Sequence, residues 1–383
     1  MTQNKEIRWV PLGEFIEQLD LRNRDNCLGV DDVRGISVDK VFTPTKANLE
    51  GVSLSSYKVV PPNAFAYVPD TSRRGDKIAL AFNGTESSFL ISSIYTTFQI
   101  HNQSFLPTYL YIWFARPDFN RFARFNSWGS ARETLDWDDF LDIKIPVPYK
   151  DGEPDVERQR EVVEIWQGLR RLKEENEALA TPLLDLCQAK MDELKHSAPM
   201  VELGEYIEQC DERNSDNTYK VDSVRGLATS KDIIPTKAKM QDVSLTSYKV
   251  MHKYDIAYVA DTSRRGDKVS MGYNETDENY LLSSISTVFK SKDFEELAPT
   301  YMYLWFCRPE FDRYARFNSW GSAREAFSWE EMCRVKIPKP SIEVQRAIVD
   351  IYNCARRAKE IAEEASQQLK NVCPALMQHI IHV

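Results

Sequence analysis

Apolar side chains in the first part of the chain recur with two different periods, one helical and one strand-like. In residues 9–20 they share one face of a helix, which predicts a short amphipathic helix. Residues 65–68 and 78–82 are apolar runs on either side of a basic loop that contains glycine, so they predict two strands joined by that loop. Residues 89–100 alternate loosely and predict a further strand or pair of strands.

A helical pattern that is rich in aromatic side chains follows over residues 107–125, where Pro117 predicts a break. Residues 136–139 open a further short helix. In the matching segment later in the chain, Ser328 and Glu331 have the spacing of a capping box, in which each side chain accepts a hydrogen bond from the other's backbone N–H. An Ile-Pro-x-Pro motif then closes the pattern, at residues 145–148 and at residues 337–340.

Two long segments repeat apolar residues at heptad spacing, which is typical of a coiled-coil seam. The first has Val162, Ile165, Leu169, Leu172, Leu179, Leu183 and Leu186, with Asn176 and Lys190 as polar exceptions; the second has Ile348, Ile351, Ala355, Ala358, Ala362, Ala365, Leu369, Val372 and Leu376. Because one segment offers mostly large side chains and the other small ones, we expect the two helices to pack on each other. The alternative is that each helix lies on its own globular unit.

The whole chain is one unit written twice. Residues 123–133 return without change as residues 315–325, and the basic loop at residues 71–77 returns as residues 262–268. Both copies therefore consist of a globular unit followed by a long helix.

Composition and charge narrow the class of protein. The 383 residues suffice for two or three domains, and a hydrophobic content of 42% supports their cores. No apolar run of about 18 residues occurs and the first residues lack the pattern of a signal peptide, so no membrane span is expected. The seven cysteines, an odd number, predict free thiols in a reducing cytoplasm. The net charge of −9 argues mildly against a simple nucleic-acid coat.

Motifs for catalysis are scarce. The sequence has neither the phosphate-binding loop Gly-x-x-x-x-Gly-Lys-Ser/Thr nor the Asn/Asp-Pro-Pro-Tyr/Phe segment of amino-methyltransferases. None of the five histidines has a counterpart in the other copy, and no Cys/His spacing indicates zinc. One nuclease-like combination exists, Asp118 with Asp142 and Lys144, but Arg334 replaces Asp142 in the second copy. A non-catalytic protein is therefore the preferred interpretation, and a metal-dependent nuclease is an alternative.

The duplicated loops combine basic, amide and aromatic side chains, a composition suited to nucleic acid. Arginine can bond guanine with two hydrogen bonds and asparagine can do the same for adenine, while many polar groups contact phosphates. The candidate DNA-contacting residues of the first copy are Arg73, Arg74, Lys77, Arg124, Asn126, Ser127, Trp128, Ser130 and Arg132; those of the second are Arg264, Arg265, Lys268, Arg316, Asn318, Ser319, Trp320, Ser322 and Arg324.

Each type of candidate also has a purely structural explanation. Trp128 is alternatively a core residue, and Arg73 and Arg74 are alternatively solvated surface charges. Arg132 is alternatively paired with Glu133 or with a helix end.

The complete pattern resembles the specificity subunit (S, HsdS) of type I restriction-modification systems. The resemblance covers essentially the full chain: two similar globular units, each ending in a Trp-Asp/Glu-Asp/Glu helix and an Ile-Pro-x-Pro strand, precede long helices that start near Gln159 and Gln345. Residues 157–163 and 338–349 look like that family's transition into its spacer helices and are fairly specific. One departure is the close similarity of the two units, which usually differ in this family.

The resemblance implies a non-catalytic chain that binds double-stranded DNA and directs partner subunits to it. The implied partners are two methyltransferase (M) subunits and restriction/translocase (R) subunits. No cofactor is then expected on this chain, because S-adenosylmethionine belongs to the M subunits, and ATP and Mg belong to the R subunits. The implied setting is a cytoplasmic system of phage defence without a membrane partner.

The implied fold class is α+β, with two similar target-recognition domains, each followed by a long α-helix, and with the two helices packed as an antiparallel coiled coil with pseudo-two-fold symmetry. The expected domains are residues 1–155 (first target-recognition domain), 156–197 (central spacer helix), 198–341 (second target-recognition domain) and 342–383 (distal spacer helix). Two nearly identical domains related by a two-fold axis would meet the half-sites of DNA on opposite strands. We therefore expect a bipartite, near-palindromic target. The alternative is a non-catalytic two-fold scaffold that holds two identical partner proteins without contacting DNA.

Overall fold

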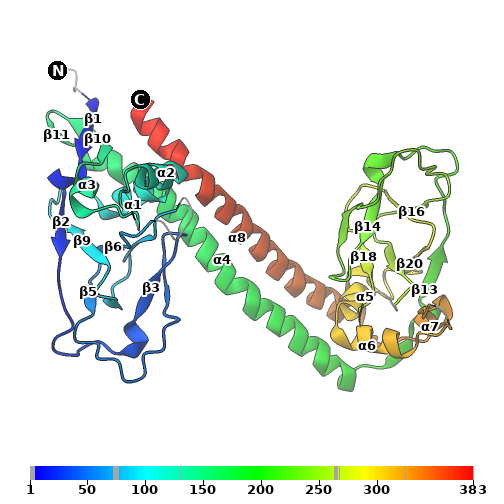
Figure 1. Cartoon of the computed structure of the whole chain (residues 1–383). Helices are drawn as coiled ribbons and strands as arrows, with labels where there is room; N and C mark the ends of the chain where they lie inside the picture. Colours follow the sequence, from blue (N-terminus) through cyan, green and yellow to red (C-terminus); the bar gives the residue numbers. More distant parts are fainter. Residues whose placement is uncertain are drawn as a thin grey trace. The chain divides into compact units, whose positions relative to one another are not determined.

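The computed structural model divides the chain into two compact units, each built around one globular domain (Figure 1). Unit 1 comprises residues 1–176 with 360–383, and unit 2 comprises residues 177–359. Each unit therefore combines a globular domain, the first part of the long helix that follows it and the last part of the other long helix. The residues that the structure describes are 5–71, 77–130, 132–262, 266, 268–322 and 324–382.

The first domain consists of short strands and short helices, followed by one long helix. Its strands are β1 (Lys5–Pro11), β2 (Ile16–Leu19), β3 (Arg34–Ile36), β4 (Phe42–Pro44), β5 (Lys58–Val60), β6 (Phe65–Tyr67), β7 (Leu80–Phe82), β8 (Phe89–Ile91), β9 (Thr96–Ile100), β10 (Lys144–Lys150) and β11 (Glu153–Pro154). Its helices are α1 (Pro107–Ala115), α2 (Pro117–Phe125), α3 (Trp137–Leu141) and the long α4 (Val156–Ser197).

The second domain repeats this order of elements, without a counterpart of β11. Its strands are β12 (Met200–Glu202), β13 (Ile207–Cys210), β14 (Arg225–Leu227), β15 (Ile233–Pro235), β16 (Lys249–Met251), β17 (Ile256–Val259), β18 (Met271–Tyr273), β19 (Tyr280–Leu282), β20 (Ser286–Ser291) and β21 (Lys336–Pro338). Its helices are α5 (Pro299–Phe306), α6 (Pro309–Phe317), α7 (Trp329–Cys333) and the long α8 (Ile342–His382).

A four-stranded antiparallel sheet lies at the centre of each domain. The strand order is β2-β9-β6-β7 in unit 1 and β13-β20-β17-β18 in unit 2. In unit 1 Phe65 lies opposite both Phe82 and Phe98, and it stacks on Phe98 with 4.9 Å between ring centroids. Phe114 of α1 meets both Phe65 and Phe98 edge-on. Fully burying such a ring contributes about 1.5–3 kcal/mol, so this aromatic cluster holds α1 on the sheet.

The prediction of a helix over residues 9–20 is wrong. The segment forms β1, a 3₁₀ turn at Leu12–Glu14 and β2, and its copy forms β12, Leu203–Glu205 and β13. Distant strands decide the outcome, because β1 pairs along its whole length with β10 and β2 pairs with β9. These backbone hydrogen bonds outweigh the local helical period.

Other local predictions are confirmed. Strands β6 and β7 flank the basic loop, and β8 and β9 lie within residues 89–100. Helix α1 ends just before Pro117, and α2 begins there. The cap of α7 is also present, since the backbone N–H of Glu331 donates to the hydroxyl of Ser328 at 3.3 Å.

The two long helices run antiparallel, as their contacts in unit 1 show. Arg158, near the start of α4, donates to the carbonyl of Ile380, near the end of α8, at 3.4 Å. Further along α4, Trp166 contacts Cys373, which precedes Ile380 in α8. Rising residue numbers on one helix therefore meet falling numbers on the other. No helix in the described part of the chain is long and apolar enough to span a bilayer.

The predicted seam is confirmed on α8 but only partly on α4. On α8 the buried positions include Ile348, Ala355, Ala358, Ala362, Ala365 and Leu376. On α4 the predicted positions Ile165, Leu172, Leu179 and Leu186 are exposed, and the buried side chains are Val162, Val163, Trp166, Ala180, Cys187 and Met191. The buried face of α4 is therefore rotated about the helix axis from the predicted seam. In unit 1 the globular domain explains this rotation, because Trp166 packs edge-on against Tyr111 of α1 and so faces inward.

A buried glutamine fixes each long helix to its domain. Gln159 is fully buried; its side-chain oxygen accepts the backbone N–H of Leu106 at 2.9 Å, and its amide donates to the carbonyl of Ser104 at 3.1 Å. Gln345 makes the equivalent bonds to Ala298 and Glu296. Because a buried polar group is costly unless it is bonded, these glutamines set the angle at which each helix leaves its domain.

Candidate nucleic-acid interface

The repeated eleven-residue segment forms the end of α2 and a closed loop after it. The backbone of Trp128 exchanges two hydrogen bonds with Thr134, at 3.0 and 2.9 Å, and so closes the loop. Gly129 permits this turn with φ +139°, and a Cβ built on it would lie 2.0 Å from the carbonyl oxygen of Arg132. Gly321 has the same conformation in the second copy, with φ +142°. The presence of glycine at this position in both copies therefore has a steric cause, since any larger residue would collide with the backbone of the loop.

The basic loop at residues 71–77 starts against this closed loop. The backbone N–H of Thr71 donates to the carbonyl of Glu133 at 3.0 Å, and its hydroxyl donates to the same carbonyl at 3.2 Å. Thr262 and Glu325 repeat both bonds in unit 2. Two candidate clusters that lie about 50 residues apart in sequence are thus joined within each domain.

Arg124 and Arg316 do not extend freely from the surface. Arg124 forms an ion pair with Glu133, and Arg316 forms the same pair with Glu325. Glu133, which the sequence offered as a partner of Arg132, is instead paired with Arg124. These partly exposed ion pairs hold the ends of α2 and α6 to the residue that precedes the loop-closing bonds. The side chains that extend from the loop into solvent are therefore others.

Two of the candidate polar residues serve the loop itself. The hydroxyl of Ser127 is buried and donates to the carbonyl of Ala123 at 2.6 Å, and Ser319 does the same with Ala315. The side-chain amide of Asn126 donates to the carbonyl of Phe122 at 2.9 Å. Asn318 repeats this bond to Tyr314 in unit 2. Ser127 and Ser319 are thus buried at the ends of α2 and α6, and their contact with DNA stays a prediction.

Large aromatic side chains are exposed beside these loops. Trp128 is 64% and Trp320 67% exposed, which rules out the alternative of a core position. Phe125 and Phe317 are 78% and 80% exposed; sequence reasoning missed them, although both lie in the repeated segment. The exposed polar candidates around them are Lys77, Ser130, Arg132, Lys268, Ser322 and Arg324.

Four of the candidate arginines, Arg73, Arg74, Arg264 and Arg265, lie outside the described residues. Their assignment rests on the sequence alone.

The nuclease alternative finds no support in the described part of the chain. Asp118 forms an exposed ion pair with Arg121. Within residues 5–71, 77–130, 132–262, 266, 268–322 and 324–382, no three His, Cys, Asp or Glu side chains gather closely enough to hold a metal ion.

Replacing Gly129 by alanine should distort the loop, because the added methyl group meets the Arg132 carbonyl. We expect a loss of about 1–3 kcal/mol in local stability, the usual range for a strained backbone. Hydrogen exchange at residues 124–134 would report it as faster exchange. Gly152→Ala is the matched control: Gly152 also has a positive φ, of +93°, but nothing lies within 4 Å of the added Cβ. Equal effects of both substitutions would contradict the steric explanation.

Comparison with known proteins identifies the fold of this chain. No protein-family model and no curated protein matches the sequence. Among solved structures, the chain is similar to the S subunit of a type I restriction-modification system from M. genitalium, with 12% sequence identity over 99% of this chain and 96% of that chain and a TM-score of 0.58. The chain has the fold of a type I S subunit.

Two further solved structures show weaker similarity. The HsdS subunit from Thermoanaerobacter tengcongensis is 17% identical over 98% of this chain and 96% of its own, with a TM-score of 0.41. A chain from a study of complex assembly and conformational transition of the type I R-M system is 16% identical over 100% and 99%, with a TM-score of 0.39. The fold assignment rests on the M. genitalium structure. It agrees with the predicted α+β class, the two similar domains and the antiparallel long helices.

Proposed function

We propose that this chain is the non-catalytic DNA sequence-recognition subunit of a cytoplasmic type I restriction-modification complex. The observation that carries the proposal is the duplicated surface of exposed tryptophan, phenylalanine, arginine and lysine on two domains of S-subunit fold. Aromatic and basic side chains together suit base contacts and phosphate contacts. The residues proposed to contact DNA are Lys77, Trp128, Ser130, Arg132 and their copies Lys268, Trp320, Ser322 and Arg324, together with Arg73, Arg74, Arg264 and Arg265.

Arg124 and Arg316 are proposed to contact DNA through the exposed part of their side chains. Asn126 and Asn318 are proposed to act indirectly, by holding the loop from which the neighbouring side chains extend. The bipartite, near-palindromic target follows from the repeat, since two nearly identical surfaces recognise nearly the same bases on opposite strands. Departures from the palindrome should trace to segments that differ between the copies, such as residues 84–88 and 275–279.

Exposed leucine and isoleucine side chains on α4 support the proposed protein partners. Ile165 and Leu172 in unit 1, and Leu179 and Leu186 in unit 2, are each 43–51% exposed at heptad spacing. A regular stripe of this kind fits the helices of another protein. We propose that M subunits bind here, that they carry S-adenosylmethionine, and that R subunits with ATP and Mg join them.

DNA binding by the full chain with its M subunits tests the proposal. The affinity for a genomic fragment that carries the methylation motif should fall steeply as salt rises from 50 to 200 mM, by roughly 10³-fold or more if six phosphates are contacted. A fragment with a scrambled motif is the control and should bind more weakly at every salt concentration. A scaffold that only holds two partners would bind neither fragment in a salt-dependent manner, and this result would refute DNA recognition.

A further inference from the structure

Each unit has a cleft beside a hairpin: in unit 1 it lies between the β3–β4 hairpin and both long helices, and in unit 2 between the β14–β15 hairpin and α8. The cleft of unit 1 has a volume of about 580 Å³, and that of unit 2 about 350 Å³. Equivalent residues line both clefts: Arg34, Lys40, Phe82, Phe89, Tyr111, Trp166 and Arg170 in unit 1 correspond to Arg225, Lys231, Tyr273, Tyr280, Tyr303, Tyr352 and Arg356 in unit 2. The two clefts are therefore copies of one site.

One arginine of each cleft is held in the same way in both units. Arg34 donates to the carbonyls of Asp31 and Val33, and its guanidinium carbon lies 5.0 Å from the ring centroid of Phe89. Arg225 donates to the equivalent carbonyls and lies 4.7 Å from the ring of Tyr280. Bonds to carbonyls and a ring orient the guanidinium but do not neutralise its charge.

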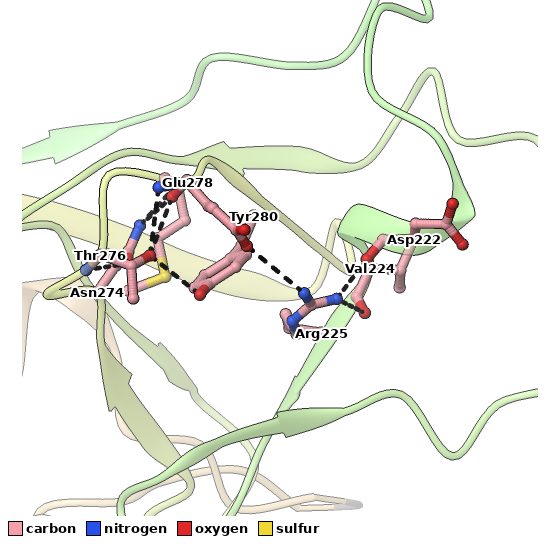
Figure 2. Close-up of polar contacts among 8 residues, drawn as sticks. Asp222, Val224, Arg225, Asn274, Thr276, Glu278 and Tyr280 are labelled. Carbon is pink, nitrogen blue, oxygen red and sulfur yellow. Dashed lines mark hydrogen bonds and ion pairs between the residues drawn. The ribbon is translucent and has the colours of Figure 1, made fainter.

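In unit 2, two carboxylates of the chain face the two arginines of the cleft. Glu275 forms an ion pair with Arg356, and Glu278 lies 4.0 Å from Arg225. Figure 2 shows that Glu278 belongs to a turn fastened by hydrogen bonds, in which the side chain of Asn274 donates to the carbonyl of Glu278 at 2.8 Å and the hydroxyl of Thr276 donates to the Asn274 oxygen at 2.8 Å. The turn thus presents its own acidic groups to the cleft.

In unit 1, uncharged residues stand at both acidic positions. Gly84 corresponds to Glu275, and Ser87 corresponds to Glu278. The turn keeps its fastening, because Asn83 donates to the carbonyl of Ser87 at 2.8 Å and Thr85 donates to the Asn83 oxygen at 2.7 Å. A Cβ built on Gly84 would lie 3.1 Å from the ring of Phe82, which must shift slightly, and 3.8 Å from Nη1 of Arg170, so a side chain at this position would reach the arginine, as Glu275 reaches Arg356 in unit 2.

The cleft of unit 1 is consequently more basic as well as larger. Apart from the buried Lys40 and Lys231, the described lining of the unit 1 cleft has the basic residues Arg34, Arg170, Lys173 and Lys370 against Asp39 and Glu174, and that of the unit 2 cleft has Arg225 and Arg356 against Asp232 and Glu275. Arg170 contacts the carboxylate of Glu174 on the same helix, at 2.7 Å from Nε. A cleft of this volume with an aromatic lining and a few converging charges has the usual character of a small-molecule site.

We propose that the unit 1 cleft binds a small organic dianion, whose charged group lies opposite the two arginines in place of the carboxylates that Glu275 and Glu278 supply in unit 2. Arg170 and Arg34 would bind its phosphate or paired carboxylate groups. The half-buried rings of Phe82 and Phe89 would pack against a flat apolar part of the same ligand. Unit 2 supplies these acidic groups itself, so of the two described clefts that of unit 1 takes the ligand. The site is proposed in addition to DNA recognition, and its turn at residues 84–88 is also one of the segments to which we trace departures from the palindrome.

Calorimetric titration of the full chain at fixed ionic strength tests the site, with adenosine 5′-monophosphate as a dianion that carries a flat ring. One equivalent should bind. Inorganic phosphate should bind in competition with it, and adenosine, which has the ring without the charge, should bind at least tenfold more weakly. Failure of the wild-type chain to bind either anion, or equal affinities for the nucleotide and adenosine, would overturn the proposal.

Matched variants exchange the two copies. Gly84→Glu introduces the acidic group of unit 2 and should weaken nucleotide binding at least tenfold; Ser87→Glu, on an exposed residue, is a second variant with the same expected direction. The double variant Glu275→Gly, Glu278→Ser gives unit 2 the residues of unit 1 and should raise the stoichiometry to two. Wild-type binding by Gly84→Glu, or one site in the double variant, would overturn the assignment. So would a loss of DNA affinity in Gly84→Glu without any nucleotide binding by the wild type, because the cleft would then serve a DNA phosphate.

Discussion

Replacing Asp312 by alanine is expected to destabilise unit 2 by about 3–5 kcal/mol at neutral pH, the range for breaking a buried ion pair. The carboxylate of Asp312 lies 2.5 Å from the ammonium of Lys231, which is buried, and it also accepts the backbone N–H of Val269 at 2.9 Å. Without it, Lys231 would keep the carbonyl of Val269, at 3.0 Å, and the ring of Phe311, whose centroid lies 5.3 Å from the ammonium, but no opposite charge at this contact. The free energy of unfolding in urea measures the loss, and hydrogen exchange assigns it to residues 198–341.

Unit 1 contains a natural control for this substitution. Lys40 corresponds to Lys231; it donates to the carbonyl of Ile78 at 2.9 Å, but its side-chain partner is the neutral Asn120 in place of Asp312. Because no charge is lost, Asn120→Ala should cost about 1–3 kcal/mol, the price of an unsatisfied polar group. Equal losses for Asn120→Ala and Asp312→Ala would show that the ion pair itself contributes little.

The two lysines should also respond differently to pH. Burial lowers the pKa of Lys40 from 10.5 to about 7, so folded unit 1 binds fewer protons than the unfolded chain between these values. Its stability should therefore rise with pH across this window and fall as pH drops toward 7. Burial also lowers the pKa of Lys231, but the Asp312 carboxylate opposes the change. Asp312→Ala should remove this opposition and make the stability of unit 2 rise more steeply with pH.

The internal repeat made much of the fold predictable. An apolar run that recurs with the same turn signals predicts the same strand in both copies, and β6, β7, β8 and β9 follow those runs. Residues 9–20 failed because the choice between helix and strand depends on β10, which lies more than 120 residues away and cannot be recognised from local periodicity. The prediction of which α4 residues form the seam failed for a similar reason, since Trp166 faces Tyr111 of the globular domain as well as α8.

The candidate interface shows which site residues sequence can identify. Identity between copies marked the repeated loop, but it did not separate residues that build the loop from residues that face outward. Ser127 and Gly129 are identical because the loop needs a buried hydroxyl and a glycine conformation, whereas Trp128 and Phe125 are identical although they are exposed. The repetition of the exposed residues Trp128 and Phe125 has no explanation within the loop, so it is their repetition that points to a ligand.

Replacing both Trp128 and Trp320 by alanine is expected to weaken binding of the target DNA by about 2–6 kcal/mol, because loss of one base contact in a duplex typically costs about 1–3 kcal/mol. That range corresponds to a loss of roughly 30-fold to more than 10⁴-fold in affinity. Both rings are largely exposed and their backbone sits in a loop closed by hydrogen bonds, so truncation should leave the domains folded.

The single variants make the test sharper, because each domain is proposed to contact one half-site. Trp128→Ala should make binding less sensitive to base changes in one half-site, and Trp320→Ala should do the same for the other, with losses that agree within about tenfold. Binding to DNA with either half-site scrambled, measured at one salt concentration, distinguishes these results. Tyr254→Ala is the control, since Tyr254 is an exposed aromatic residue of unit 2 away from the repeated loop. If both tryptophan variants lost sensitivity to the same half-site, or if neither lost any, the assignment of one domain to each half-site would be wrong, because two nearly identical surfaces can recognise separate half-sites only when each contacts its own.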